Sequence, residues 1–171
     1  MKTFYITTPI YYVNDKAHIG HAYTSMACDM IARFKRLDGF DVKFLTGTDE
    51  HGQKIEKAAA DKGVGPQAFV DNVSKLFSEL STTLNLTNDD FIRTTEPRHK
   101  KAVQHLWQKL VDSGNIYLGE YAGWYAVRDE SFYQEDEIID GYAPTGATVE
   151  WISEPSYFFK LSAWAEPLLE Y

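Results

Sequence analysis

One pattern near the N-terminus limits the possible folds more than any other feature of the sequence. It consists of an apolar strand, an amphipathic helix and a second apolar strand. Residues 3–8 are rich in β-branched and aromatic side chains and stop at Pro9, which is typical of a strand. Residues 19–37 carry apolar side chains at helical spacing and precede Gly39, a residue type that favours a helix end. The apolar run at residues 42–46 then predicts a buried strand.

This strand–helix–strand unit predicts a parallel sheet, because a crossover helix returns the chain to the sheet in the same direction. Two further amphipathic patterns, at residues 67–84 and 98–111, predict additional helices. We therefore expect an α/β fold with a Rossmann-like parallel sheet that carries helices on both faces. Residues 1–114 are expected to form this α/β layer.

The composition of the chain changes near residue 114. From residue 115 to residue 152 the chain is aromatic, punctuated by glycine, and acidic at Glu135-Asp136-Glu137. Alternating side chains there predict an inserted small lobe of short antiparallel strands, after which residues 153–171 return towards the α/β domain. The acidic residues are most simply a solvated surface, with a weak Mg²⁺ or Ca²⁺ site as the alternative.

Composition also argues against several classes of protein. The hydrophobic fraction of 44% is enough for a core, and the net charge of −8 argues against a stand-alone nucleic-acid-binding module. The chain has no apolar run as long as a membrane span and no secretory signal, so we expect a cytoplasmic protein. The single cysteine, Cys28, is consistent with a reducing compartment and favours a small buried residue over a nucleophile.

The loop between the first predicted strand and helix carries the most suggestive polar residues. Ligands of open parallel sheets bind outside the carboxyl ends of the strands, and free amides at a helix N-terminus favour an anion such as phosphate. His18 and His21 are three residues apart and face the same way, and Gly20 leaves room for a flat purine. Two solvent-exposed histidines are an equal alternative, and a zinc site completed by Asp49 or His51 is a weaker one.

The segments around these histidines resemble methionyl-tRNA synthetases. His18-Ile19-Gly20-His21 matches the HIGH signature of class I aminoacyl-tRNA synthetases. Residues 8–14, 44–55 and 150–162 are similar to the methionine-type members of that family, in the same order along the chain. The resemblance implies a methionine–tRNA ligase, in which ATP with Mg²⁺ activates L-methionine to methionyl-adenylate and the methionyl group passes to tRNA(Met). It implies no membrane partner and leaves the oligomeric state open.

The resemblance also implies roles for individual residues. His18 and His21 bind the phosphates of ATP and act in catalysis, and Gly20 lies under the adenine. Residues 1–114 are then the N-terminal part of a nucleotide-binding catalytic domain.

Three further residues are implied to bind methionine. Ile10 and Tyr12 line the pocket for its side chain, where sulfur–ring contacts contribute about 0.3–1.5 kcal/mol. Asp49 holds the α-ammonium group of the substrate. Without the resemblance, Asp49 is equally a loop-capping residue and Tyr12 is more simply a core residue.

The chain departs from the family pattern in two respects. Ala126 and Asp129 stand where many relatives have a Cys-x-x-Cys pair, and Ala143-Pro144 replaces a Cys-Pro, so we expect a lobe without structural zinc. We find no counterpart of the lysine-rich KMSKS loop or of the helical anticodon-binding domain, so we expect an N-terminal fragment. The alternatives are a catalytically inactive ATP- or methionine-binding module, or another nucleotidyltransferase with the HIGH signature.

Overall fold

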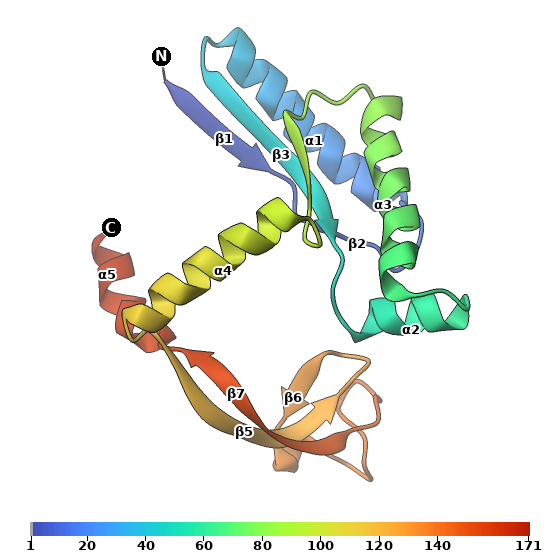
Figure 1. Cartoon of the computed structure of the whole chain (residues 1–171), viewed down its shortest axis with the longest axis vertical. Helices are drawn as coiled ribbons and strands as arrows, with labels where there is room; N and C mark the ends of the chain where they lie inside the picture. The colour runs from blue at the N-terminus through green and yellow to red at the C-terminus, as the bar shows by residue number, and fades with distance from the viewer. Residues whose placement is uncertain (1) are drawn as a thin grey trace. The chain divides into compact units, whose positions relative to one another are not determined.

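The computed structural model describes residues 2–171, which divide into two compact units, one ending at Val103 and the other beginning at Gln104. Figure 1 shows a sheet with helices in the first unit and a twisted antiparallel sheet in the second. The strands are β1 (Thr3–Thr7), β2 (Tyr11–Tyr12), β3 (Asp41–Asp49), β4 (Asp90–Arg93), β5 (Ile116–Ala126), β6 (Ser131–Tyr133) and β7 (Glu150–Phe159). The α-helices are α1 (Ile19–Leu37), α2 (Gln53–Asp61), α3 (Pro66–Thr83), α4 (Pro97–Asp112) and α5 (Ala165–Glu170), with 3-10 turns at Glu135–Glu137 and Leu161–Trp164.

The four strands of the first unit form a parallel sheet with β3 at its centre. β3 pairs with β1 over residues 41–45, with β4 over residues 45–48 and with β2 over residues 48–49. A Cβ atom at Gly47 would lie 2.0 Å from the carbonyl oxygen of Ile92 in β4, so only glycine permits this close approach. The predicted parallel sheet is confirmed, and β3 is longer than predicted because it continues through this glycine.

The predicted helices agree closely with the structure. α1 has the predicted bounds, and Gly39 follows its C-cap with a φ of +80°, which suits glycine. α3 and α4 each lie within one residue of the predicted bounds. In the first unit β2, β4 and α2 were not predicted.

The helices α1 and α3 pack on the same face of the sheet. Tyr11 of β2 joins them, since its hydroxyl lies 2.8 Å from Ser25 Oγ in α1 and its ring stacks on Phe77 of α3. On the opposite face Tyr5 is 60% exposed and Lys43 is exposed. The core of the unit lies under the helices and consists of Tyr11, Val13, Ile55, Ala59, Phe69, Val70, Val73 and Phe77 in one cluster and Ala32, Val42 and Phe44 in another.

Cys28 is half-buried beside the second of these clusters. Burial raises the pKa of its thiol, which disfavours the reactive thiolate. The structure therefore gives Cys28 a packing role, as the sequence predicts.

Asp29 ties α1 to the chain that follows α3. Its carboxylate accepts hydrogen bonds from the amide and the hydroxyl of Thr87, both at 2.6 Å, and from Arg33 Nε at 2.6 Å. Burial raises the pKa of Asp29, but these hydrogen bonds outweigh it and the net pKa lies below the ordinary value. The carboxylate therefore contributes stability while it is ionised.

We expect Asp29→Ala to lower the free energy of unfolding by about 2–3 kcal/mol, because it leaves the Thr87 amide and Arg33 Nε without their acceptor. Urea unfolding monitored by circular dichroism measures this difference. The stabilisation is present above the ordinary aspartate pKa of about 3.9 and is lost as the pH falls through the lowered native pKa. The exposed Asp61 is the control, and Asp61→Ala should change the unfolding free energy by less than about 0.5 kcal/mol.

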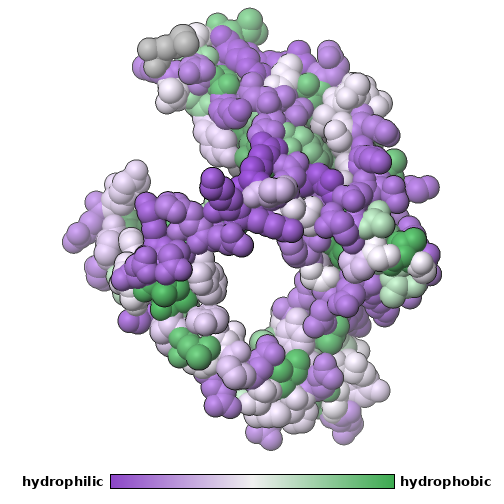
Figure 2. Space-filling view, in the orientation of Figure 1, coloured by the Kyte–Doolittle hydropathy of each residue, from purple (hydrophilic) through white to green (hydrophobic). Residues whose placement is uncertain are grey.

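The second unit contains a three-stranded antiparallel sheet in the order β6-β5-β7. β6 is short, as predicted for this lobe, whereas β5 and β7 have 11 and 10 residues and pair along almost their whole length. β7 continues through residue 152, and the boundaries predicted at residues 114 and 152 stay a prediction. Figure 2 shows a strongly hydrophilic surface over α4, a helix with no buried residue.

Among residues 2–171, no helix combines the length and the apolar character needed to cross a membrane.

Candidate functional site

The predicted site residues of the first unit lie at the carboxyl end of its parallel sheet. Figure 1 shows β2, the arrowhead of β3 and the first turn of α1 at this end. Tyr12 and Asp49 are register partners in adjacent strands, and His18 caps α1. In open α/β sheets ligands bind at this edge.

His18 and His21 form a reciprocal cap at the start of α1. His18 Nδ1 accepts a hydrogen bond from the amide of Gly20 at 3.1 Å, and His21 Nδ1 accepts one from the amide of His18 at 3.1 Å. Their rings stack with centroids 3.8 Å apart. Because each Nδ1 is an acceptor, a neutral ring carries its proton on Nε2, which is then the atom able to donate to a phosphate oxygen.

His21 lies in an aromatic setting that keeps it neutral. Its ring makes edge contacts with Tyr11 and Phe77, at centroid distances of 4.8 Å and 5.0 Å. Burial and, to a lesser extent, the neighbouring His18 lower the pKa of His21 below its ordinary value. The sequence did not single out Tyr11 or Phe77 as neighbours of this histidine.

The amides of this helix start are already used within the chain. Gly20 donates to the His18 ring, and the amides of His21 and Ala22 donate to the His18 carbonyl oxygen at 3.0 Å and 3.2 Å. The expectation of free amides is therefore wrong at these three positions. An anion held here depends on the imidazoles instead.

Gly20 makes the histidine cap possible. A Cβ atom at this position would lie 3.0 Å from His18 Cε1, so a larger residue would push the imidazole away. The His18 ring occupies the space above Gly20, and the placement of adenine there stays a prediction. A purine at that place requires His18 to turn aside.

Tyr12 and Asp49 come together, as the predicted pocket for methionine requires. The hydroxyl of Tyr12 donates to the carbonyl oxygen of His51 at 2.9 Å. Gly52 has a φ of +112°, and a Cβ atom there would lie 2.3 Å from the Tyr12 hydroxyl, so this contact requires glycine. Ile10, directly before β2, is 46% exposed and is accessible to a ligand.

The carboxylate of Asp49 makes only a weak contact with its neighbours in the described residues. Its Oδ1 accepts from the amide of His51 over a long distance of 3.4 Å. An ammonium group is a stronger partner, because hydrogen bonds between charged groups are shorter and stronger than this contact.

The geometry does not favour a zinc ion at the histidines. His18 Nδ1 and His21 Nδ1 accept backbone amides, and His51 Nδ1 lies 3.1 Å from the Thr94 hydroxyl. Within residues 2–171, no three histidine, cysteine, aspartate or glutamate side chains gather closely enough to hold a metal.

Alanines and hydrogen bonds hold the lobe around Ala126 and Asp129. Ala126, Ala143 and Ala147 form a small buried cluster. Asp129 accepts hydrogen bonds from the hydroxyls of Thr145 and Tyr133. The Thr145 hydrogen bond and, to a lesser extent, Arg128 and Tyr133 lower the pKa of Asp129. These contacts are compatible with a zinc-free lobe, which stays a prediction.

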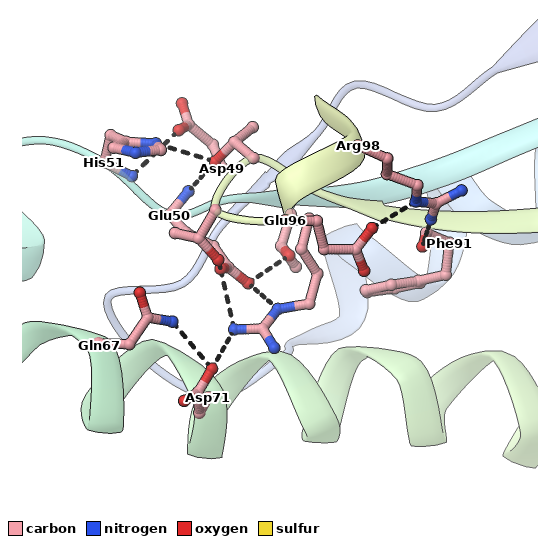
Figure 3. A network of polar contacts seen from close by, with 12 residues as sticks. Asp49, Glu50, His51, Gln67, Asp71, Phe91, Glu96 and Arg98 are labelled. Carbon is pink, nitrogen blue, oxygen red and sulfur yellow. Dashed lines mark hydrogen bonds and ion pairs between the residues drawn. The ribbon is translucent and has the colours of Figure 1, made fainter. Parts of the chain in front are cut away.

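Sequence reasoning missed two charged residues beside Asp49. Glu50 follows it directly and is fully buried, and its carboxylate receives two hydrogen bonds from Arg93, at 2.7 Å and 3.0 Å (Figure 3). A signal was available for Glu50, which directly follows β3, because it continues the run of buried even-numbered residues that begins with Val42 and Phe44.

Comparison with known proteins gives three results. The family described as "tRNA synthetases class I (M)" matches residues 4–150. Methionine–tRNA ligases of Rickettsia conorii and Listeria monocytogenes are 67% and 51% identical over 99% of this chain. The crystal structure of Mycobacterium tuberculosis methionyl-tRNA synthetase bound by methionyl-adenylate superimposes with a TM-score of 0.89 and 48% identity over 99% of this chain. The chain spans 34% of the Rickettsia relative, 27% of the Listeria relative and 34% of the solved structure.

Proposed function

The chain belongs to the tRNA synthetases of class I (M), and on that premise we propose that it supplies the HIGH-signature part of a methionine–tRNA ligase. The observation that carries the proposal is the His18–His21 cap, which presents two Nε2 atoms at the carboxyl end of the sheet that holds Tyr12 and Asp49. The resemblance to a synthetase solved with methionyl-adenylate supports an ATP-dependent reaction on methionine.

In the proposed reaction the carboxylate oxygen of methionine attacks the α-phosphorus of ATP. The bond between that phosphorus and the oxygen bridging to the β-phosphate breaks, and pyrophosphate leaves with Mg²⁺. His18 and His21 donate Nε2 protons in hydrogen bonds to the phosphate oxygens as charge moves towards the leaving group. No covalent intermediate with the protein is needed, so positioning and charge stabilisation provide the catalysis.

The methionine substrate is held by the opposite end of the same site. Asp49 receives the α-ammonium group, while Tyr12 and Ile10 contact the side chain. The tyrosine hydroxyl donates to His51, and the thioether packs on the aromatic ring of Tyr12. The adenylate is then within reach of the 3′ end of tRNA(Met), to which the methionyl group is transferred.

The remaining features follow from the same proposal. Mg²⁺ enters the site with ATP. The lobe requires no structural zinc. The protein acts in the cytoplasm, where tRNA and ribosomes meet.

Isotope exchange between ATP and pyrophosphate tests this function. We expect the natural-length protein to catalyse exchange that depends on L-methionine and is absent with leucine or isoleucine. We expect residues 1–171 alone to exchange near the background rate, because the lysine-rich loop is missing. Both methionine-independent exchange and a complete lack of exchange would contradict the proposal. The first would favour another nucleotidyltransferase, and the second a binding module without catalysis.

A further inference from the structure

The chain at the end of β3 points consecutive side chains to opposite faces of the sheet. Asp49 is in register with Tyr12 of the neighbouring strand β2. Glu50 turns to the helix-covered face, where none of its side chain is exposed. The burial of Glu50 therefore sets the direction in which Asp49 points.

Glu50 is held by a complete set of donors (Figure 3). Its Oε1 accepts from Arg93 Nε at 2.7 Å and from the Thr48 hydroxyl at 2.9 Å. Its Oε2 accepts from a second Arg93 nitrogen at 3.0 Å and from the Thr95 hydroxyl. A buried carboxylate stays ionised only where donors replace its hydration in this way.

The peptide on either side of Glu50 is fixed as well. The amide of Glu50 donates to Thr94 Oγ1 at 2.9 Å, and the same hydroxyl lies 3.1 Å from His51 Nδ1. Because this hydroxyl accepts from the amide, its own proton is available to His51. The Tyr12 hydroxyl also donates to the carbonyl oxygen of His51. The segment after Asp49 is therefore held at the Glu50 amide, the His51 ring and the His51 carbonyl oxygen.

Arg93 is itself fixed from a second direction. Arg93 is the last residue of β4, and its guanidinium group donates to Asp71 of α3 at 2.5 Å. This contact adds to the two parallel hydrogen bonds, the fork, that Arg93 donates to Glu50. These two carboxylates raise the pKa of Arg93, with Glu50 the larger cause, so the arginine stays charged. The side chain of Asp71 is 44% exposed, which makes it the outer and weaker support.

We infer that Glu50 and Arg93 are positioning residues for methionine, which hold the Asp49 carboxylate beside Tyr12 so that it receives the ammonium group without rearrangement. This inference rests on the proposed function, in which Asp49 makes that contact. The pair touches neither substrate, so its effect runs through the Asp49 side chain.

The test compares Glu50→Gln, Asp49→Asn and the double variant in methionine-dependent exchange by the natural-length protein. We expect Glu50→Gln to raise the KM for methionine about tenfold, with the KM for ATP and kcat per folded site within about threefold. Because Glu50 acts through Asp49, the double variant should have the methionine KM of Asp49→Asn alone.

Arg98→Gln is the matched control, since Arg98 also joins two carboxylates, those of Asp90 and Glu96, but is not bonded to the end of β3. Its methionine KM should equal that of the parent. Where Glu50→Gln fails to fold, Arg93→Lys keeps the charge and removes the fork, and it should give the same rise in KM.

Three outcomes would overturn the inference in distinguishable ways. An unchanged methionine KM in a folded Glu50→Gln or Arg93→Lys, alongside a raised one in Asp49→Asn, removes the positioning role and keeps the ammonium contact. Additive effects in the double variant do the same. An unchanged KM in Asp49→Asn removes the ammonium contact itself and the inference with it.

Discussion

Replacing His21 by alanine should slow methionine-dependent exchange by about 10²–10³-fold, the usual loss when one donor to a developing charge is removed. The expectation follows from the cap, in which Nδ1 accepts the His18 amide and leaves Nε2 to donate to the phosphate. Methionine binding should be nearly intact, because Tyr12 and Asp49 lie in other elements. Steady-state exchange and calorimetry with methionine measure the two quantities. A variant that exchanges at the parental rate would exclude a phosphate role for His21.

The alanine variant loses both the Nδ1 acceptor of the helix cap and the Nε2 donor. Two amide variants, each of which replaces one of these nitrogens, separate the two losses. His21→Asn places an oxygen near the Nδ1 position, which retains the cap and removes the outer donor. His21→Gln reaches the Nε2 position with a donor amide and gives up the cap acceptor. We expect His21→Gln to retain more exchange activity and His21→Asn to retain more thermal stability. The reverse order would show that the cap itself is the main contribution.

The pH dependence offers a further check on the same residue. The lowered pKa of His21 keeps its imidazole neutral at neutral pH, and the neutral ring still carries the Nε2 proton. The exchange rate should therefore not fall between about pH 6.5 and pH 8, where an imidazolium would lose its charge. A fall with a midpoint near the ordinary histidine pKa, abolished in His21→Gln, would mean that the charged form is the active one.

The parts of the fold that depend on local signals could be predicted from the sequence. α1 was predicted with its observed bounds, because its apolar spacing and the Gly39 that follows are both local features. β2 was missed because a pattern of two residues is too short to predict a strand. Tyr11 and Tyr12 are extended through their pairing with Thr48 and Asp49. β4 was missed for the same reason, since its four residues are fixed by β3.

For the candidate site, the sequence suggested residues but not their contacts. The spacing of His18 and His21 and the family resemblance predict both histidines and Asp49 as site residues, but no local pattern could show that the Nδ1 atoms bind backbone amides. The bond between Glu50 and Arg93 joins residues 43 positions apart, and such a pairing depends on the register of β3 and β4. Candidate site residues could therefore be proposed from the chain, whereas the contacts that hold their side chains came from the tertiary structure.

Exchanging Asp49 for asparagine should weaken methionine binding by about 10- to 100-fold, since a hydrogen bond between charged groups contributes about 1.5–3 kcal/mol. Asparagine keeps the shape of the side chain and can still accept the long contact from the His51 amide, so the fold should not change. The loss is therefore one of charge. Calorimetric titration of parent and variant with L-methionine measures it directly.

The charge argument makes a sharper prediction when the ligand lacks the ammonium group. 4-(Methylthio)butanoate carries the same thioether and carboxylate as methionine but has nothing for Asp49 to hold. The parent should prefer methionine by the same factor, about 10- to 100-fold, and Asp49→Asn should lose most of this preference. The carboxylate of the analogue lies near Asp49 in the same pocket, so removing the like charge should leave its affinity equal or slightly higher. Equal affinities of parent and variant for methionine would place the ammonium group elsewhere in the site.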